Sequence, residues 1–398
     1  MSALCLYFQA HQPLRIKNYS FFDIGQDKAY FDTSLNKSIL NKVSDQCYLP
    51  TNALLLTLIK KHKGKFKCTF SMSGVLIEQL AKYRPDVLAS FQALVATGKV
   101  ELLGETYFHS LASLYSTEEF ERQLKLHRKI IQKYFNIEPT FFRNTELLYN
   151  NSIVEILEKN GYKGIWIEGS ENGIGNFNVN RNYTAIDSNN FSLVPRNFPL
   201  SDDIAFRFLK GNHKLDADKF TRKILRLKSE ENSIHIGLDY ETFGEHYEAD
   251  SGILYFFKNW IDKSITSKSI RFCTSTEALK IHPPTKKISI ENTTSWADSE
   301  KDGSAWLGNA MQQECIEKLY SLRDIVFKLK NRSLQDNWSA LQCSDHFYYM
   351  SNKQHADGEV HNYFSHFDSP HSAYLSFINI LTDLELKINN MRIYSAGQ

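Results

Sequence analysis

Short apolar runs alternate with longer amphipathic segments along the first 280 residues of this 398-residue chain. Apolar runs of four or five residues between polar turns are typical of buried strands, and apolar positions three and four apart indicate helices. Strands that alternate with helices predict parallel strands joined by helical crossovers. Seven strands are predicted in this part, at residues 4–8, 67–71, 100–103, 140–143, 164–167, 205–208 and 234–238.

Helical patterns fill the gaps between these strands. The clearest begins at Ser116, where Ser116 and Glu119 have the spacing of a capping box and apolar positions then recur at helical spacing. After Pro283 and Pro284 the strand pattern stops and only helices are predicted, so the chain changes character there. The predicted helices lie at residues 51–61, 76–96, 116–135, 152–159, 216–228, 251–263, 305–328, 334–345 and 372–389.

Two of the predicted strands end in acidic residues. In LDYETFGEH at 238–246, Asp239 and Glu241 are two residues apart and would point to the same side of an extended strand. In FFRNTELLYN at 141–150, Glu146 follows Arg143 just after another strand. A polar strand end turning into solvent would also give either pattern alone. Two such ends, however, could supply the pair of carboxyl groups that glycoside hydrolysis needs.

The surroundings predict different charges for the two acids. Arg143 would keep Glu146 ionised, whereas burial and the like charge of Glu241 would raise the pKa of Asp239. An ionised carboxylate suits a nucleophile, and a carboxyl group that holds its proton suits a general acid.

Both segments resemble signature regions of glycoside hydrolase family 57, namely its third (FRNTELLYN) and fourth (LDYETFGEH). FQAHQPLR at 8–15, VELLGETYFHSLASLY at 100–115 and ADGEVHNYFSHFDSP at 356–370 are similar to its first, second and fifth regions. Together with LSDDIAFRF, they most resemble the α-amylase-like branch of the family. One departure is Gln9, which stands where many members have the first His of HxHQP.

The resemblance implies a fold that the strand pattern alone leaves open, because parallel βα units can also form an open doubly wound sheet. It implies an incomplete TIM-like (β/α)7 barrel at residues 1–282. A C-terminal helical domain would follow at residues 283–398 and contribute to the active-site cleft.

The resemblance also implies an activity, the cleavage of α-1,4-linked glucans by a retaining mechanism. Glu146 would be the nucleophile and Asp239 the general acid/base. A retaining pair is expected to hold its carboxyl groups about 5–5.5 Å apart. A 4-α-glucanotransferase or another α-glucan-active member of the family is the alternative enzyme.

Further residues are candidates for substrate contacts because they follow strand ends, lie in signature regions, or offer aromatic planes to sugar rings. His109 could equally close a turn, and Asp202, Asp203 and Arg207 could form an internal ion pair that orders the sixth strand. The candidates are His11, Gln12, Glu105, His109, Arg143, Trp166, Arg207, Glu241, Phe243, His246, Trp306, Asp357 and His361.

Charge and cysteine content narrow the partners and the compartment. The formal net charge is +2 without a basic run, which argues against nucleic acid or an anionic membrane as a partner and favours a neutral substrate. Six cysteines without a CxxC pair indicate free thiols in a reducing compartment. With no signal-peptide pattern and no run of about 20 apolar residues, we expect a soluble cytoplasmic protein of undetermined oligomeric state.

Two rival functions differ in what the sequence should contain. A metal-dependent hydrolase, such as a polysaccharide deacetylase or an α-mannosidase, needs a cluster of ligands. The chain has thirteen His but no HExxH, and its signature segments bring no three or four ligands into one place, so we expect no metal and no other cofactor. A non-enzymatic glucan-binding relative would be expected to have lost an acid, whereas this chain keeps both Glu146 and Asp239.

Overall fold

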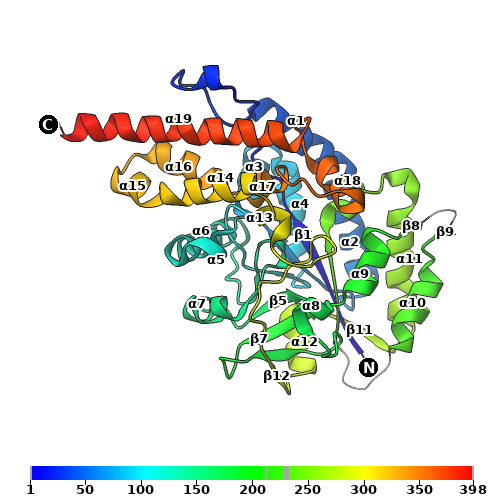
Figure 1. The fold of residues 1–398 in the computed structure, drawn as a ribbon. Coiled ribbons are helices and arrows are strands. Elements are labelled where there is room, and N and C mark those ends of the chain that lie inside the picture. The colour runs from blue at the N-terminus through cyan, green and yellow to red at the C-terminus, as the bar shows by residue number, and fades with distance from the viewer. Residues whose placement is uncertain (1, 211–212, 228–232, 397–398) are drawn as a thin grey trace.

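The computed structural model describes residues 2–210, 213–227 and 233–396. Strands lie at the centre, helices surround them, and a long C-terminal helix crosses the molecule at one end (Figure 1). None of the described helices has both the length and the apolar character needed to cross a membrane.

Seven parallel strands among the described residues form the barrel wall. One sheet has the order β10-β1-β2-β3, and β4, β5 and β7 are neighbours in a second sheet. A bridge between Gly104 and Phe142 joins β3 to β4, and the Asn197 N–H donates to the His235 carbonyl at 2.7 Å, which joins β7 to β10. The strands are β1 (Ser2–Ala10), β2 (Cys68–Met72), β3 (Val100–Leu102), β4 (Phe142–Arg143), β5 (Gly164–Glu168), β7 (Ser192–Arg196) and β10 (Ser233–Asp239).

Smaller strands extend or flank this wall. β11 runs parallel to the first half of β1, β6 is antiparallel to β7, and β12 pairs with β6. A separate two-stranded sheet is formed by β8 and β9. Their bounds are β6 (Tyr183–Ala185), β8 (Leu209–Lys210), β9 (His213–Lys214), β11 (Ile270–Cys273) and β12 (Lys287–Ile288).

One predicted strand is wrong. Of residues 205–208, Ala205 ends helix α9 (Phe198–Ala205) and the other three follow it. The barrel strand is the preceding segment SLVPR, β7. Asn197 accepts a hydrogen bond from Leu200 N and so caps α9, and Pro199 lies in its first turn, where its missing N–H costs nothing. The other six predicted strands are confirmed.

Three of the predicted helices are broken. Residues 334–345 run from α16 (Arg332–Ala340) into α17 (Ser344–Tyr348), and the other two divide as follows. Residues 76–96 form two helices because Pro85 begins the second, and residues 305–328 divide into α13, α14 and α15. Ser116 caps α6 by accepting from Glu119 N at 3.2 Å. The helices are α1 (Thr33–Val43), α2 (Leu49–Lys61), α3 (Gly74–Tyr83), α4 (Pro85–Ala96), α5 (Ala112–Tyr115), α6 (Thr117–Phe135), α7 (Val154–Lys159), α8 (Glu171–Ile174), α9 (Phe198–Ala205), α10 (Ala217–Arg226), α11 (Ile253–Thr266), α12 (Ser275–Ile281), α13 (Ser304–Leu307), α14 (Ala310–Ser321), α15 (Arg323–Lys328), α16 (Arg332–Ala340), α17 (Ser344–Tyr348), α18 (His355–Phe364) and α19 (Pro370–Ala396).

Side chains of β1 alternate between two environments, as the pleat of a strand requires. Leu4, Leu6 and Phe8 pack into the core beneath the surrounding helices. Cys5 and Tyr7 face the barrel interior with residues of the opposite wall. Since the interior is filled by side chains, chemistry is confined to the ends of the strands.

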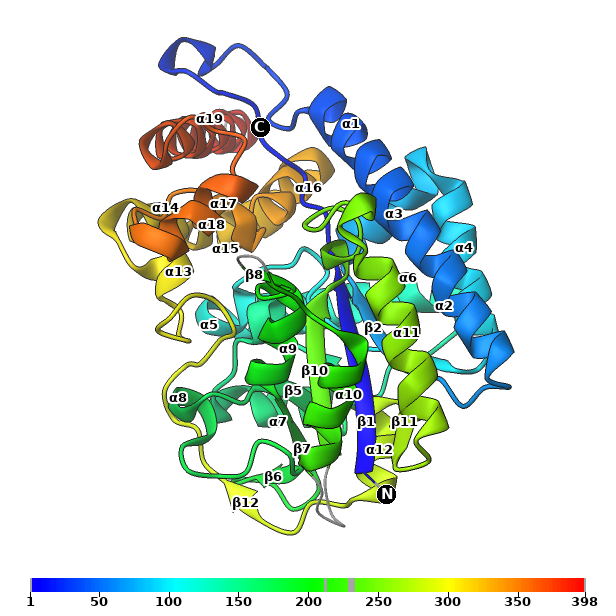
Figure 2. The same ribbon diagram turned by 90° about the vertical axis from the view of Figure 1, so that its right-hand side faces the viewer.

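The C-terminal helical region covers the end of the barrel at which the parallel strands finish (Figure 2). Its core includes Ile16, Leu111 and Leu148, which follow β1, β3 and β4 in the chain. The chain does not leave the barrel at once after residue 283, because β12 still pairs with β6. The division into domains 1–282 and 283–398 therefore stays a prediction.

A close approach of the backbone fixes the segment after β10. Gly244 has a φ of +127°, and a Cβ atom there would collide with the carbonyl oxygen of Gln46. Gly98 also has a positive φ, +66°, but an added Cβ would meet nothing within 4 Å. Alanine at Gly98 would therefore carry only the cost of a positive φ, whereas alanine at Gly244 would carry that cost and a steric collision as well.

We expect Gly244→Ala to lower the Tm clearly more than Gly98→Ala. The control carries only the strain of a positive φ, of order 1–3 kcal/mol, whereas Gly244→Ala adds the collision with backbone. Scanning calorimetry of both variants checks this. Equal Tm values would show that the segment after β10 moves freely enough to accept a side chain.

Candidate active site

Acidic and imidazole side chains gather where the strands of the barrel end. Asp239 is the last residue of β10 and lies opposite Gln9 of β1 in the ladder. Glu146 follows β4, and Glu105 follows β3. The carboxyl ends of parallel strands meet at one face of a barrel, so these residues come together although they are far apart in sequence.

Glu146 is held by two hydrogen bonds and an unusual backbone. His109 Nε2 lies 2.9 Å from Oε1, and Trp296 Nε1 donates to Oε2 at 2.6 Å. Glu146 and Leu147 both have φ near +55°, a left-handed conformation that costs non-glycine residues energy. The short helical turn η3 (Thr145–Leu147) therefore presents this carboxylate in a strained arrangement that its partners must stabilise.

Burial by itself would raise the pKa of Glu146, but its neighbours outweigh it. The hydrogen bond and charge of His109, the charge of Arg143 and the hydrogen bond of Trp296 lower the pKa below its ordinary value. The expectation that Arg143 helps to keep Glu146 ionised is thus confirmed, although His109 contributes more.

His109 carries the positive charge that this balance needs. Burial alone would lower its pKa, yet Glu105 and Glu146 together raise it to about 9. Glu105, whose Oε1 lies 3.7 Å from His109 Nδ1, is completely buried. Burial would raise its pKa, but the hydrogen bond and charge of His109, together with the charges of His127 and Arg143, lower the pKa to about 2. The Glu105 carboxylate, the His109 imidazolium and the Glu146 carboxylate therefore lie in a row, with His109 in the middle.

Asp239 has the opposite environment. Burial and then the charge of Glu146 raise its pKa to about 7, against the weaker effects of Arg143 and Arg196. No hydrogen bond to its carboxyl group is found among the described residues, so no donor favours the ionised form. The raised pKa and the effect of burial were predicted, but the charge that raises the pKa of Asp239 most is that of Glu146. The coupling between Asp239 and Glu241 raises the pKa of Glu241 instead.

Glu241 is itself a buried acid. Burial and the charge of Asp239 raise its pKa to about 8, despite the hydrogen bond that the Tyr48 hydroxyl donates to its Oε1. The same oxygen accepts from His11 N at 3.4 Å. Through this hydrogen bond, Glu241 connects β10 to the loop after β1.

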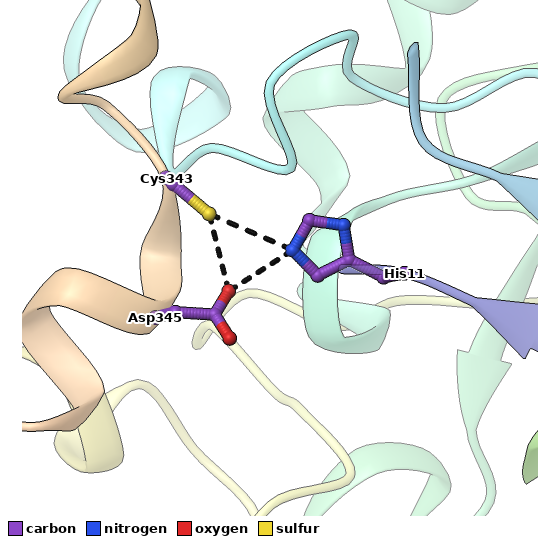
Figure 3. Close-up of side chains that lie close together, drawn as sticks. All are labelled: His11, Cys343 and Asp345. Carbon is purple, nitrogen blue, oxygen red and sulfur yellow. Dashed lines mark hydrogen bonds and ion pairs between the residues drawn. The ribbon is translucent and has the colours of Figure 1, made fainter. Parts of the chain in front are cut away.

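His11 lies between this acid and a second cluster. Its ring stacks on His109 with centroids 4.0 Å apart, and its Nδ1 is 2.6 Å from Ser73 Oγ. On the other side, its Nε2 approaches Cys343 and Asp345, both of which come from the C-terminal helical region (Figure 3). These three residues are the one group among the described residues with the proximity needed to hold a metal ion.

Three candidates for sugar contacts are instead core residues. Trp166 is fully buried inside the barrel, 4.9 Å from the Tyr7 ring, and donates to Ser275 Oγ at 2.8 Å. Trp306 is buried in the helical region, and Phe243 packs on Phe8 beneath the helices. The prediction that they line the substrate cleft is wrong, because none exposes a ring face.

The two candidate arginines, Arg143 and Arg207, have different surroundings. Arg143 is buried against the Trp296 ring at 4.8 Å, and its guanidinium nitrogens have no hydrogen-bond acceptor among the described residues. Arg207 lies at the end of α9 and binds Asp203 and the Pro199 carbonyl. The predicted ion pair is confirmed for Arg207 and Asp203, but it orders a helix rather than a strand, and Asp202 pairs with Arg196 instead.

The remaining candidates, Gln12, His246 and Asp357, make contacts with residues other than Glu146 and Asp239. Gln12 accepts from Arg15 at 3.1 Å, and His246 packs edge-on against Phe364 of α18. Asp357 binds Ser299. None of these contacts reaches Glu146 or Asp239.

The fifth signature region approaches the acids through a tyrosine that the sequence did not reveal. His361 stacks on Tyr348 with centroids 3.6 Å apart and lies 3.1 Å from Asp298. Burial and then the charges of Asp298, Glu146 and Asp239 raise the pKa of Tyr348, so this phenol lies within electrostatic reach of both acids.

Other residues of the site were also missed. Trp296, in a loop 150 residues after Glu146, gave no signal, and neither did Cys343 or Asp345, which lie outside the signature segments. Gln9 was noted only as a departure from the family pattern. It is buried, accepts from Tyr7 at 2.6 Å and donates to Glu105 at 3.2 Å, so the departure lies inside the barrel.

Solved structures share this fold. A branching enzyme of Pyrococcus horikoshii has a TM-score of 0.69 and 16% identity over 91% of this chain and 87% of that one. An alpha-amylase of Thermotoga maritima has a TM-score of 0.66 and 13% identity over 99% and 96%. For a 4-alpha-glucanotransferase of Thermococcus litoralis the TM-score is 0.66 at 14% identity, with 87% of this chain but 56% of that one covered, so this chain spans about half its length.

Sequence comparison identifies the family. A model described as glycosyl hydrolase family 57 matches residues 5–291. A Methanocaldococcus jannaschii protein that carries the provisional name alpha-amylase is 40% identical over 403 aligned positions, which cover 96% of this chain and 84% of that protein. The barrel, the paired acids and these matches together show that the chain belongs to glycosyl hydrolase family 57.

Proposed function

We propose that this chain is a retaining glycoside hydrolase of the α-amylase type, which cleaves α-1,4 linkages of glucans. The observation that carries the proposal is the opposed pKa shift of two neighbouring acids, lowered for Glu146 and raised to about 7 for Asp239. The two shifts supply an ionised nucleophile and a protonated acid in one site.

In the first step, the Glu146 carboxylate attacks the anomeric carbon while Asp239 gives its proton to the departing glycosidic oxygen. His109 and Trp296 hold Glu146 through separate oxygens, which fixes its orientation. We expect the two carboxyl groups to be about 5–5.5 Å apart, the separation of retaining enzymes.

In the second step the same two acids act again, but Asp239 now takes up a proton instead of giving one. Once Glu146 is esterified to the sugar it carries no charge, so one cause of the raised pKa of Asp239 disappears. Having given up its proton in the first step, Asp239 therefore stays ionised, takes a proton from water as a general base, and the attacking water oxygen releases the sugar from the Glu146 carboxylate. The coupling of the two acids thus suits both steps.

The substrate class rests on the named relatives. An alpha-amylase, a branching enzyme and a glucanotransferase share the fold, and the relative with 40% identity carries a provisional alpha-amylase name. A glucan is neutral, in agreement with the formal charge of +2.

The pH profile of kcat/KM should be a bell with an alkaline limb that belongs to Asp239. The reaction needs Asp239 protonated, so activity should fall as pH rises through about 7. It also needs Glu146 ionised, so the acid limb should lie below the ordinary glutamate pKa near 4.5. Initial rates on starch between pH 3 and 9 measure both limbs.

Asp239→Asn should remove the alkaline limb and affect substrates unequally. An activated aryl maltoside departs with little protonation, so its first step should be largely spared, while starch cleavage should fall by about 10²–10⁴-fold. Azide, which needs no general base, should speed turnover and give a glycosyl azide of retained configuration. Surface variant Asp218→Asn is the matched control.

Equal loss on both substrates without azide rescue would remove Asp239 from the acid/base role. Glu241, the second acid with a raised pKa, would then be the next candidate.

Hydrolysis and transfer are separated by the products from maltoheptaose. Both begin with the same glycosyl-enzyme, which is then attacked by water or by another sugar. We expect chromatography to show only oligosaccharides shorter than maltoheptaose at early times. Products longer than the substrate would identify a glucanotransferase instead.

A further inference from the structure

We propose that His11, Cys343 and Asp345 form a binding site for one zinc ion, beside the two carboxyl groups of the proposed reaction. The first residue follows β1, and the other two lie at the start of α17, 332 or more positions later in the chain. Figure 3 shows the three side chains converging from these two elements.

The three ligand atoms already have nearly the spacing of a zinc coordination shell. His11 Nε2 lies 3.1 Å from Asp345 Oδ2 and 3.6 Å from Cys343 Sγ, and Sγ lies 3.1 Å from Oδ2. Bonds of about 2.0–2.3 Å at tetrahedral angles would place such atoms roughly 3.3–3.6 Å apart. Shifts of a few tenths of an ångström therefore turn the triangle into one face of a zinc tetrahedron.

A hydrogen-bond partner at the Nδ1 atom of His11 favours metal binding through the Nε2 atom of the same ring. Ser73 Oγ is 2.6 Å from Nδ1 and is itself fixed as the N-cap of α3, where it accepts from Leu76 N. A donor N–H at Nδ1 would leave the Nε2 lone pair for a metal, which is how ligating histidines are usually oriented.

Charge and access also fit a divalent cation. A zinc ion with the Cys343 thiolate and the Asp345 carboxylate makes a neutral group, so burying it costs less than burying an unbalanced charge. The thiol releases its proton to solvent as the zinc–sulfur bond forms. The His11 and Asp345 side chains are 9% and 23% exposed, so the site is not sealed from solvent. We expect water to take the fourth position on the zinc ion.

The kinds of ligand determine which metal the site prefers. A thiolate, an imidazole and one carboxylate suit zinc, whereas magnesium and calcium need oxygen ligands in larger number. We therefore expect Zn²⁺ to bind and Mg²⁺ and Ca²⁺ not to bind.

This inference does not rest on the proposed function, because the cleavage assigned to Glu146 and Asp239 uses carboxyl groups alone. Chelator-treated protein should keep its activity on glucans. Loss of activity on chelation with recovery in zinc would contradict the proposed function, while the binding measurements below test the metal site by itself.

The experiment uses the full chain after removal of metals with a chelator. Calorimetric titration with Zn²⁺ should give one site per chain, and Co²⁺ in place of zinc should show the visible bands of tetrahedral cobalt and a thiolate-to-metal absorption. Cys343→Ser, which keeps a donor for Asp345, should lose the thiolate absorption. Its affinity should fall by more than the roughly 10–100-fold that loss of an outer-shell partner costs.

Two further variants make the outcome decisive. Asp345→Asn should also weaken binding, and Cys315→Ala, which changes a buried thiol in the core of the helical region, should bind zinc as the unchanged chain does. If the unchanged chain fails to bind Zn²⁺, or if Cys343→Ser and Asp345→Asn bind it equally well, the proposal is wrong.

Discussion

The electrostatic coupling between two partly buried carboxyl groups, those of Glu146 and Asp239, is the constraint on which this site depends. Glu146 is the one that ionises, because His109, Arg143 and Trp296 outweigh the effect of burial. Its charge in turn helps to hold the proton on Asp239. His109 is kept cationic by Glu105 as well as by Glu146, so the balance extends through a row of groups and no member can change alone.

The fold supplies these groups from distant parts of the chain. Parallel strands bring Glu105, Glu146 and Asp239 to one end of the barrel, whose interior is filled by residues such as Tyr7 and Trp166. The loop after β12 contributes Trp296, and the helical region contributes Tyr348 and bonds to the loop that carries His109 through Ser344 N at 2.9 Å. The C-terminal helices are therefore part of the site's structure and do more than cover it.

Periodicity and strand ends could be read from the sequence because both are local. Six barrel strands and the acids that follow them were predicted, whereas β7 was missed because Pro195 and the polar residues beside it hide the strand pattern. Trp166 was misplaced because its inward direction depends on which side of β5 faces the barrel interior. Trp296 meets Glu146, and Cys343 and Asp345 meet His11, across 150 or more residues of sequence, which no local pattern encodes.

The most direct test of the central claim is to find which carboxylate carries the sugar. The protein would be incubated with a fluorinated α-glucosyl donor whose glycosyl-enzyme hydrolyses slowly, then digested and mapped by mass spectrometry. The account predicts a glucosyl label on the peptide that contains Glu146, and no label in Glu146→Gln. A label on Asp239 or Glu241, or unchanged labelling of Glu146→Gln, would contradict it.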